Sequence, residues 1–322
     1  MFSILLPYIL ILIAFVLLAK GADFFISGAS NIAKYFRVSP LFIGLTLAAI
    51  GTSAPEAAVS IKASIAGANG IALGNIVGSN IANICLAIGI AALIKPLYFE
   101  DSTIQKEIPF MILITVLLFI FGINFSHIHS KFAVISRFEG IILLLLFIGF
   151  LIYLSRMAVR DRKNNISQVQ NKDMPILKNI LLVSIGGIAI AFGGHLAVEN
   201  AVKIARMWDV SPKVIGISVV ALGTSIPEIV TSIVAVTRGK ISIAVGNIVG
   251  SNIFNILFVL GIASSIHPIT LSSNIVIDIV ICLGIAVLFF VFSKIGKNFR
   301  KVTGIILLIC YVFYILFLFR YG

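Results

Sequence analysis

Two short sequences each occur twice in this chain. Residues 51–56 read GTSAPE and residues 223–228 read GTSIPE, while residues 74–83 read GNIVGSNIAN and residues 246–255 read GNIVGSNIFN. Each copy places a proline and a glutamate inside a long apolar segment. The spacing between the two motifs is the same in both copies, without insertion or deletion, which indicates a tandem duplication.

Composition assigns the chain to the polytopic membrane proteins. Hydrophobic residues make up 60% of the 322 positions and charged residues only 11%, far from the proportions of a soluble globular domain. Apolar runs of roughly 18 to 25 residues, each long enough to cross a ~30 Å hydrocarbon core as a helix, recur along the whole length. We therefore predict an all-α membrane protein with ten transmembrane helices.

The duplication divides these ten predicted helices into two halves. We expect a first five-helix repeat over residues 1–154, a polar cytoplasmic connector over 155–175 and a second five-helix repeat over 176–322, with the duplicated cores at about 40–96 and 212–268. Because each half has an odd number of spans, the second copy enters the membrane from the opposite side. The two repeats are therefore predicted to be inverted.

The net charge of +12 lies mainly between the apolar segments. Lys and Arg in such loops determine orientation and do not indicate a nucleic-acid partner. With the N-terminus outside, most of them face the cytoplasm, including the cluster from Arg156 to Lys178. We therefore predict a multi-pass protein of the cell membrane with both termini on the extracellular side.

The GTSxPE motifs predict interrupted helices within the bilayer. Pro55 cannot donate a hydrogen bond to the carbonyl of Gly51, and Pro227 cannot donate to that of Gly223. Backbone that is not helical at membrane depth persists only where it is buried in protein or lines a cavity. Interrupted helices at corresponding places of two inverted halves indicate a transport site.

Glu56 and Glu228 are the candidate charged residues of that site. The alternative is a capping box, in which each glutamate reaches back to the backbone amide of Ser53 or Ser225 at the start of its own helix. A capping box accounts for a helix restart, but not for its occurrence twice inside the bilayer, where an ionised carboxylate costs at least ~2.5 kcal/mol. We therefore favour a functional role.

The GNIVGSN motifs predict the other wall of the site. Their polar residues recur at every fourth position, so each set lies along one face of an otherwise apolar helix. Packing alone accounts for the glycines of these motifs, but not for two matching polar stripes. The stripes consist of Asn75, Ser79 and Asn83 in the first copy and Asn247, Ser251 and Asn255 in the second.

Only oxygen ligands are available in these four segments. Carboxylate, hydroxyl, amide and carbonyl oxygens suit Ca²⁺ and, by the same hard-ligand logic, Na⁺. Two carboxylates buried close together repel each other, so an ionised site without a cation resists closure. Competition of two ions for the same carboxylates then predicts obligatory exchange instead of a leak.

The duplicated motifs resemble the α-repeats of the cation/calcium exchanger superfamily, specifically its prokaryotic sodium/calcium exchanger branch, over essentially the whole chain. The resemblance implies a Na⁺/Ca²⁺ antiporter that works by alternating access, in which slanted helices 1 and 6 slide past a central site on helices 2, 3, 7 and 8. By position, it makes Glu56 and Glu228 the principal calcium ligands. It assigns supporting roles in calcium or sodium sites to Thr52, Ser53, Ser79, Asn83, Thr224, Ser225, Ser251 and Asn255, with the carbonyls of Ala49 and Ala221.

Two departures qualify the resemblance. Asn255 stands where some relatives, in particular those that cotransport potassium, carry Asp, which argues against potassium dependence and leaves the stoichiometry open. Asp23 corresponds to His195 in the second half, so neither receives a transport role. A Ca²⁺/H⁺ exchanger, in which protons neutralise Glu56 and Glu228, remains the alternative function.

Acidic residues outside the motifs are expected to form local pairs. Lys20 and Asp23 are expected to pair with each other because a lone charge inside a membrane is unfavourable. Glu199 is expected to pair with Lys203 near the outer end of its helix, and Asp278 has no assigned partner.

The sequence does not favour an enzyme. An intramembrane protease needs a serine with a positioned histidine, or two aspartates on facing helices, and the motif helices carry no histidine. There is no phosphate-binding loop. Cys85, Cys282 and Cys310 have no ligand-like spacing. We expect no catalytic residue, cofactor or obligatory protein partner, and only the transported ions and the lipid bilayer as partners.

Overall fold

The structure is a computed structural model that describes residues 2–123, 133–164, 175–209, 221–271, 273–295 and 300–321. Within these residues, eight helices are long and apolar enough to cross a membrane, and a helix pair bent by 48° provides a ninth candidate span. This agrees with the predicted all-α membrane protein. Residues 212–220, the first part of the second duplicated core, lie outside the described residues.

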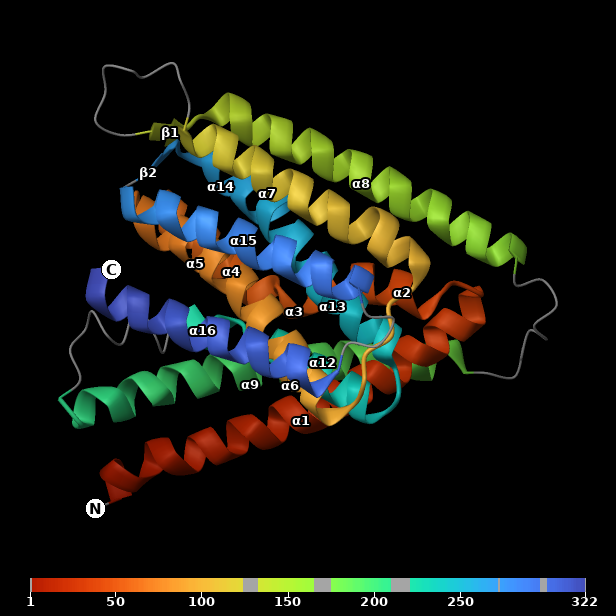
Figure 1. The fold of residues 1–322 in the computed structure, drawn as a ribbon. Helices are drawn as coiled ribbons and strands as arrows, with labels where there is room; N and C mark the ends of the chain where they lie inside the picture. The colour runs from red at the N-terminus through yellow and green to blue at the C-terminus, as the bar shows by residue number, and fades with distance from the viewer. Residues whose placement is uncertain are drawn as a thin grey trace.

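The centre of the bundle is formed by the segments that carry the duplicated motifs (Figure 1). In the most apolar 18-residue stretches of the helices over residues 70–94 and 241–266, 83% and 94% of the residues are buried, against 22% in the corresponding stretch of the helix over residues 137–164. The central segments, with η marking π-helical turns, are α2 (Pro40–Ile43), η1 (Gly44–Ala48), α3 (Ala49–Thr52), α4 (Ala54–Ile65), α5 (Asn69–Ala82), η2 (Asn83–Ile88), α6 (Gly89–Ile94), α11 (Ala221–Thr224), α12 (Ile226–Thr237), α13 (Ile241–Phe254), η6 (Asn255–Leu260) and α14 (Gly261–Ile266).

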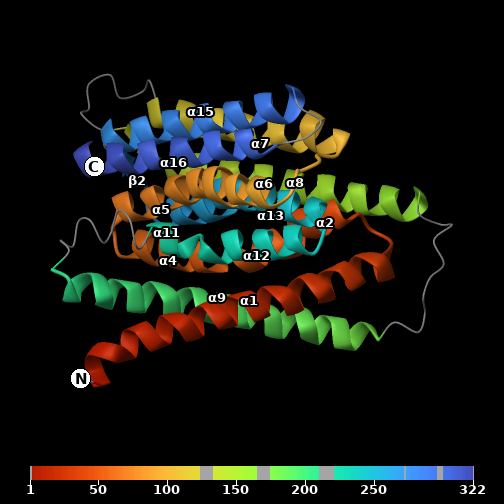
Figure 2. The ribbon, with the colours of Figure 1, turned by 60° about the horizontal axis from the view of Figure 1, so that its bottom comes forward.

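The two longest helices cross on one side of this centre (Figure 2). α1 (Phe2–Phe36) and α9 (Ile176–Met207) contact each other far more than either contacts any other element. Their backbones touch where they cross, because a Cβ atom on Gly21 would lie 2.9 Å from the carbonyl oxygen of Gly186. Small residues permit such close approach of helices in a membrane, where apolar burial against lipid gives no driving force.

The remaining helices lie along the parts of the centre that α1 and α9 leave uncovered (Figures 1 and 2). The start of α1 and the end of α16 lie at the same end of the bundle (Figure 1). A short antiparallel ribbon at that end pairs Val134 with Thr270. These remaining helices and the two strands of the ribbon are η3 (Thr103–Glu107), α7 (Ile108–Ile123), α8 (Arg137–Asn164), α15 (Ser273–Ile295), α16 (Lys301–Tyr321), β1 (Ala133–Ile135) and β2 (Ile269–Leu271).

α8 is longer than its apolar pattern predicts. The sequence places the end of the fifth helix at Leu154 and a polar connector from residue 155, whereas the helix continues to Asn164. Arginine and methionine are good helix formers, and a helix that leaves the membrane does not have to end where its apolar residues end. The first part of the expected connector is therefore helical.

Asp23 pairs with another helix and not with its own neighbour, so the expected Lys20–Asp23 pair is wrong. Its Oδ1 forms an ion pair with Nη2 of Arg238, which directly follows α12. Nη1 of the same guanidinium donates to Oγ of Ser27. The pairing depends on how α1 meets the end of α12, which residue spacing along one helix does not reveal.

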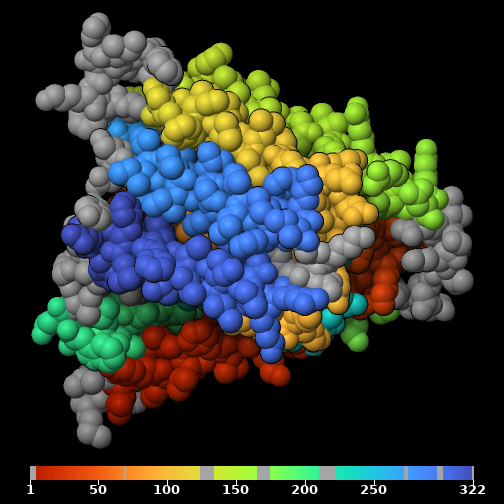
Figure 3. Space-filling model, in the orientation of Figure 1, coloured from red at the N-terminus to blue at the C-terminus, as the bar shows by residue number. Residues whose placement is uncertain are grey.

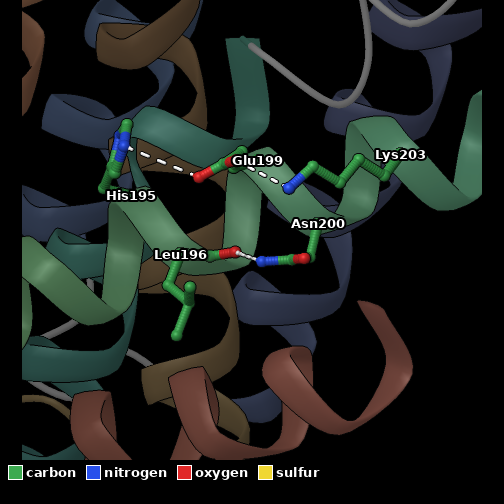
Figure 4. Close-up of polar contacts among 5 residues, drawn as sticks. All are labelled: His195, Leu196, Glu199, Asn200 and Lys203. Carbon is green, nitrogen blue, oxygen red and sulfur yellow. Dashed lines mark hydrogen bonds and ion pairs between the residues drawn. The ribbon is translucent and has the colours of Figure 1, made fainter. Parts of the chain in front are cut away.

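The charged residues of α9 pair along the exposed face of that helix, as expected for Glu199 and Lys203. Nζ of Lys203 donates to Oε1 of Glu199 at 2.7 Å, and Nε2 of His195 lies 3.9 Å from the other carboxylate oxygen (Figure 4). Asn200 is buried and donates to the carbonyl of Leu196 at 2.7 Å. These side chains partner one another within α9 and are separate from the duplicated motifs.

The crossing of η1 with α13 supplies a test of this fold. A Cβ atom on Gly44 would lie 2.6 Å from the carbonyl oxygen of Ile243 and 2.8 Å from Cα of Gly246. We expect Gly44→Ala to destabilise the protein by ~1–3 kcal/mol because backbone would have to move. The measurement is the thermal unfolding temperature in detergent. Gly284→Ala is the control, since a Cβ there meets nothing within 4 Å, and equal unfolding temperatures for the two variants would contradict the close crossing.

Candidate functional site

Ser53 and Ser225 interrupt two central helices at corresponding positions. Their ψ angles are 6° and −3°, outside the range of a regular helix, and a proline follows within the first two residues of each new helix. Neither serine side chain caps its own helix. The backbone amide of Ser53 donates to the carbonyl of Ala49 at 3.0 Å and that of Ser225 to the carbonyl of Leu222 at 3.2 Å. Neither amide is held by a glutamate, so the capping-box alternative does not describe these turns.

Glu56 and Glu228 lie in the centre of the bundle, where both side chains are fully buried. The hydroxyl of Ser53, from the first copy, donates to Oε1 of Glu228, from the second, at 2.8 Å. Both carboxylate oxygens of Glu56 and Oε2 of Glu228 have no hydrogen-bond partner, and no ion pair between described residues includes either glutamate. The two carboxylates, one from each copy, interact electrostatically with each other, and no basic residue of the described chain forms an ion pair with either of them.

Threonine hydroxyls connect each copy to the asparagine of the other. Oγ1 of Thr52 donates to Oδ1 of Asn247 at 3.1 Å, and Oγ1 of Thr224 donates to Oδ1 of Asn75 at 3.0 Å. A hydroxyl that donates its proton keeps its lone pairs as acceptors. Thr52 and Thr224, both expected site residues, can therefore still offer oxygen to a cation.

The amide nitrogens of these two asparagines hold the glutamate-bearing helices. Nδ2 of Asn75 donates to Oγ of Ser60 at 2.9 Å and lies 3.4 Å from the carbonyl oxygen of Glu56. Nδ2 of Asn247 makes the corresponding contacts in the second copy, with Ser232 at 3.0 Å and the carbonyl oxygen of Glu228 at 3.4 Å. The matching geometry fixes α4 against α5 and α12 against α13 in the same way.

Asn83 and Asn255 begin the π-helical turns η2 and η6. Nδ2 of Asn83 donates to Oδ1 of Asn252 at 3.2 Å, and Nδ2 of Asn255 donates to Oδ1 of Asn80 at 3.1 Å. The Oδ1 atoms of Asn83 and Asn255 are buried without a partner. Single π-helical turns within α-helices are frequent at functional sites, and here each begins with an amide oxygen that is free to accept.

Sequence reasoning missed Asn80 and Asn252. Both are buried, and they orient Asn83 and Asn255 from the opposite copy. They fall outside the stripes of every fourth residue, which is why helical periodicity did not select them. Their identical place in the repeated GNIVGSN sequence was the signal that could have identified them.

The other expected residues lie around this centre. Oγ of Ser79 is 3.4 Å from Oγ1 of Thr224, and Oγ of Ser251 is 3.5 Å from the carbonyl oxygen of Ala49. Ser225 is buried and its side chain lies beside the carboxylate of Glu56. Ala221 is the first residue of α11.

The chemistry of the arrangement is that of a hard-cation site. Within the described part of the chain, no group of three or more His, Cys, Asp or Glu side chains could hold a metal ion, so the charge comes from two carboxylates and the remaining donors are neutral oxygens. A site of this kind suits Ca²⁺, which takes six to eight oxygen ligands. Two carboxylates also balance the charge of one divalent ion.

Comparisons with known proteins assign the chain to a family. The family model described as sodium/calcium exchanger protein matches residues 6–156 and 178–320. The chain belongs to the sodium/calcium exchanger family. Members of this family are transporters, and eight apolar helices within the described residues agree with a membrane antiporter.

Two relatives and one solved structure match nearly the full length. The sodium/calcium exchanger MaX1 of Methanosarcina acetivorans is 32% identical over 97% of this chain and 98% of its own. The uncharacterized membrane protein MJ0091 of Methanocaldococcus jannaschii is 37% identical over 94% of both chains. A structure of the sodium-calcium exchanger NCX_Mj, soaked with 2.5 mM Na⁺ and 0.1 mM Ca²⁺, is 33% identical, has a TM-score of 0.82 and covers 97% of this chain and 98% of that one.

Removing one of the two central charges is expected to stabilise the protein when no cation is supplied. In buffer free of Na⁺ and Ca²⁺, Glu56→Gln relieves repulsion and the burial of an unpaired carboxylate, which we expect to add roughly 1–3 kcal/mol of stability. Thermal unfolding measures the change. Glu199→Gln, an exposed position on α9, is the matched control and should leave the unfolding temperature unchanged. A lower unfolding temperature for Glu56→Gln would show that Glu56 is already neutralised by the protein.

Proposed function

We propose that this protein exchanges Na⁺ for Ca²⁺ across the membrane as a secondary active antiporter. The observation that carries the proposal is the pair of fully buried glutamates, one from each copy, that no basic residue of the described chain neutralises. Membership of the sodium/calcium exchanger family supports the choice of ions. So does the likeness to NCX_Mj, a sodium-calcium exchanger that was soaked with both ions.

In this proposal Glu56 and Glu228 are the principal ligands of Ca²⁺. Their unpaired oxygens, with the free Oδ1 atoms of Asn83 and Asn255, provide buried acceptors for a desolvated ion. Na⁺ uses the same carboxylates, so the two ions compete. The further ligands come from the neutral residues around them: Thr52, Ser53, Ser79, Thr224, Ser225, Ser251 and the carbonyls of Ala49 and Ala221.

Access to the site alternates through movement of the crossed pair α1 and α9 past a more rigid centre. Each of these helices contacts chiefly the other, whereas reciprocal hydrogen bonds join the central segments of the two copies. The ion pair of Asp23 with Arg238 connects α1 to the centre. The paired contacts also support an organisation of ten helices in two inverted five-helix repeats.

Both chain termini lie on the extracellular side in this proposal. They share one end of the bundle (Figure 1), and the opposite end carries the helix ends with Lys34, Lys106, Arg156 and Arg160. Cytoplasmic ends of membrane proteins are the ones enriched in Lys and Arg.

The driving ion can be identified in proteoliposomes. We expect uptake of ⁴⁵Ca²⁺ when the vesicles contain Na⁺ and the external buffer does not. Na⁺ that leaves the vesicles vacates the two carboxylates, which then bind external Ca²⁺. Vesicles with an outward proton gradient and no Na⁺ should show only background uptake. If the proton gradient drives uptake and the sodium gradient does not, the protein is a Ca²⁺/H⁺ exchanger.

Both glutamates are expected to be essential for exchange. Glu56→Gln and Glu228→Gln should each reduce sodium-driven ⁴⁵Ca²⁺ uptake to background, since one remaining carboxylate does not balance a divalent ion. The control variant Glu199→Gln carries the same substitution on an exposed face of the protein and should transport normally. Gel filtration shows whether each variant is folded, and near-normal uptake by the two central variants would remove these residues from the mechanism.

A further inference from the structure

The ion pair between α1 and the end of α12 joins a peripheral helix to the centre of the bundle. On the face shown in Figure 3, the first part of α1 lies along the margin of the molecule. Nη2 of Arg238 pairs with Oδ1 of Asp23 on α1, and Nη1 donates to Oγ of Ser27, one turn further along the same helix. One guanidinium therefore holds two successive turns of α1.

The end of α12 is itself fixed to the centre. Nζ of Lys95, which directly follows α6, donates to the carbonyl of Thr237, the last residue of α12, at 3.1 Å. The backbone amide of Arg238 donates to the carbonyl of Val234 at 3.1 Å. α6 belongs to the first copy and α12 to the second. Arg238 thus extends from a position that both copies hold toward a helix that packs chiefly on α9.

The second copy has no equivalent of this ion pair. The shift in sequence that carries GTSAPE onto GTSIPE places His195 in the position of Asp23 and Ala66 in the position of Arg238. Ala66 has no charge, and the ring of His195 lies beside Glu199 of its own helix. Among the described residues, no ion pair joins α9 to α4. α1 also contacts α12 more extensively than α9 contacts α4, so the two ends of the bundle are held unequally.

We propose that the pair of Asp23 and Arg238 is a latch that holds the cytoplasmic end of α1 closed on the centre. This inference rests on the exchange function and the orientation proposed above. Movement of α1 past α12 separates the guanidinium from Asp23 and Ser27, since a hydrogen bond is lost beyond about 3.5 Å. The opposite conformation gains no matching pair at Ala66. An interaction made in one state alone shifts the equilibrium toward that state, so the latch favours the conformation open to the outside.

Calcium affinity measured from each side of the membrane tests the latch. Right-side-out and inside-out membrane vesicles from cells that express the full chain present opposite faces of the protein to external ⁴⁵Ca²⁺. Asp23→Asn and Arg238→Gln each remove the ion pair, and a double variant combines the two changes. Glu199→Gln is the matched control, since it removes an ion pair of similar exposure that lies within one helix.

We expect each single variant to lower the half-saturating Ca²⁺ concentration at the cytoplasmic face by roughly two- to fivefold, the effect of a partly exposed ion pair. At the extracellular face the same concentration should rise slightly. The changes are opposite because the apparent affinity at each face scales with the fraction of protein open to that face. The double variant should match the single variants, because both changes remove the same interaction, and the control should equal the parent on both faces.

Hydrogen exchange gives a second readout that does not depend on transport. In buffer without Na⁺ and Ca²⁺, α1 protects the backbone amides at the end of α12, which exchange from the population in which α1 has moved away. We expect exchange at these amides to be roughly two- to fivefold faster in Asp23→Asn than in the parent. Exchange in Glu199→Gln should equal that of the parent.

Three results would overturn the latch. They are unchanged hydrogen exchange at the end of α12 in Asp23→Asn, calcium affinities that change in the same direction on both faces, and effects of the single variants that multiply in the double variant. The second would indicate general damage to the protein, and the third would show that the two residues act independently. A parent without sodium-driven uptake whose variants show the expected hydrogen exchange would contradict the exchange function and support the latch.

Discussion

Two carboxylates lie at the centre of an apolar bundle with no basic residue of the described chain to neutralise them, and the surrounding structure is arranged around that charge. A buried anion is unfavourable because it has lost its water, and a second anion beside it adds repulsion. Glu56 and Glu228 therefore need a cation whenever the centre is closed to solvent. In the proposed function this requirement links cation binding to closure of the site, which favours exchange of one cation for another.

The neighbouring residues restrict which cation can satisfy this requirement. Asn83 and Asn255 use their amide nitrogens to hold the opposite copy, which leaves their oxygens as acceptors. Thr52 and Thr224 donate their protons to asparagines, so they also present oxygen. A shell made only of oxygen atoms favours hard cations. The glycine contact between η1 and α13 brings the two copies close enough for these hydrogen bonds.

The helices around the centre differ in what they contact. α1 and α9 pack mainly on each other, which allows them to move as a pair while the central hydrogen bonds persist. In the proposed function, α1 and α9 are the moving pair and the duplicated motifs form the ion-binding centre.

From sequence alone, the membrane class, the helical fold and the paired motifs could be predicted, because hydropathy and repetition are properties of local sequence. Asn247 and Ser251, predicted to lie along one face of a helix, both lie on α13. The end of α8 could not be predicted in this way, since helix propensity continues beyond the apolar residues. Only the tertiary structure decided that Asp23 meets Arg238, that Asn80 orients Asn255 and that Ser53 of one copy donates to Glu228 of the other. Such contacts join residues far apart in the chain over about 3 Å, so they depend on where helices cross and not on spacing within any one helix.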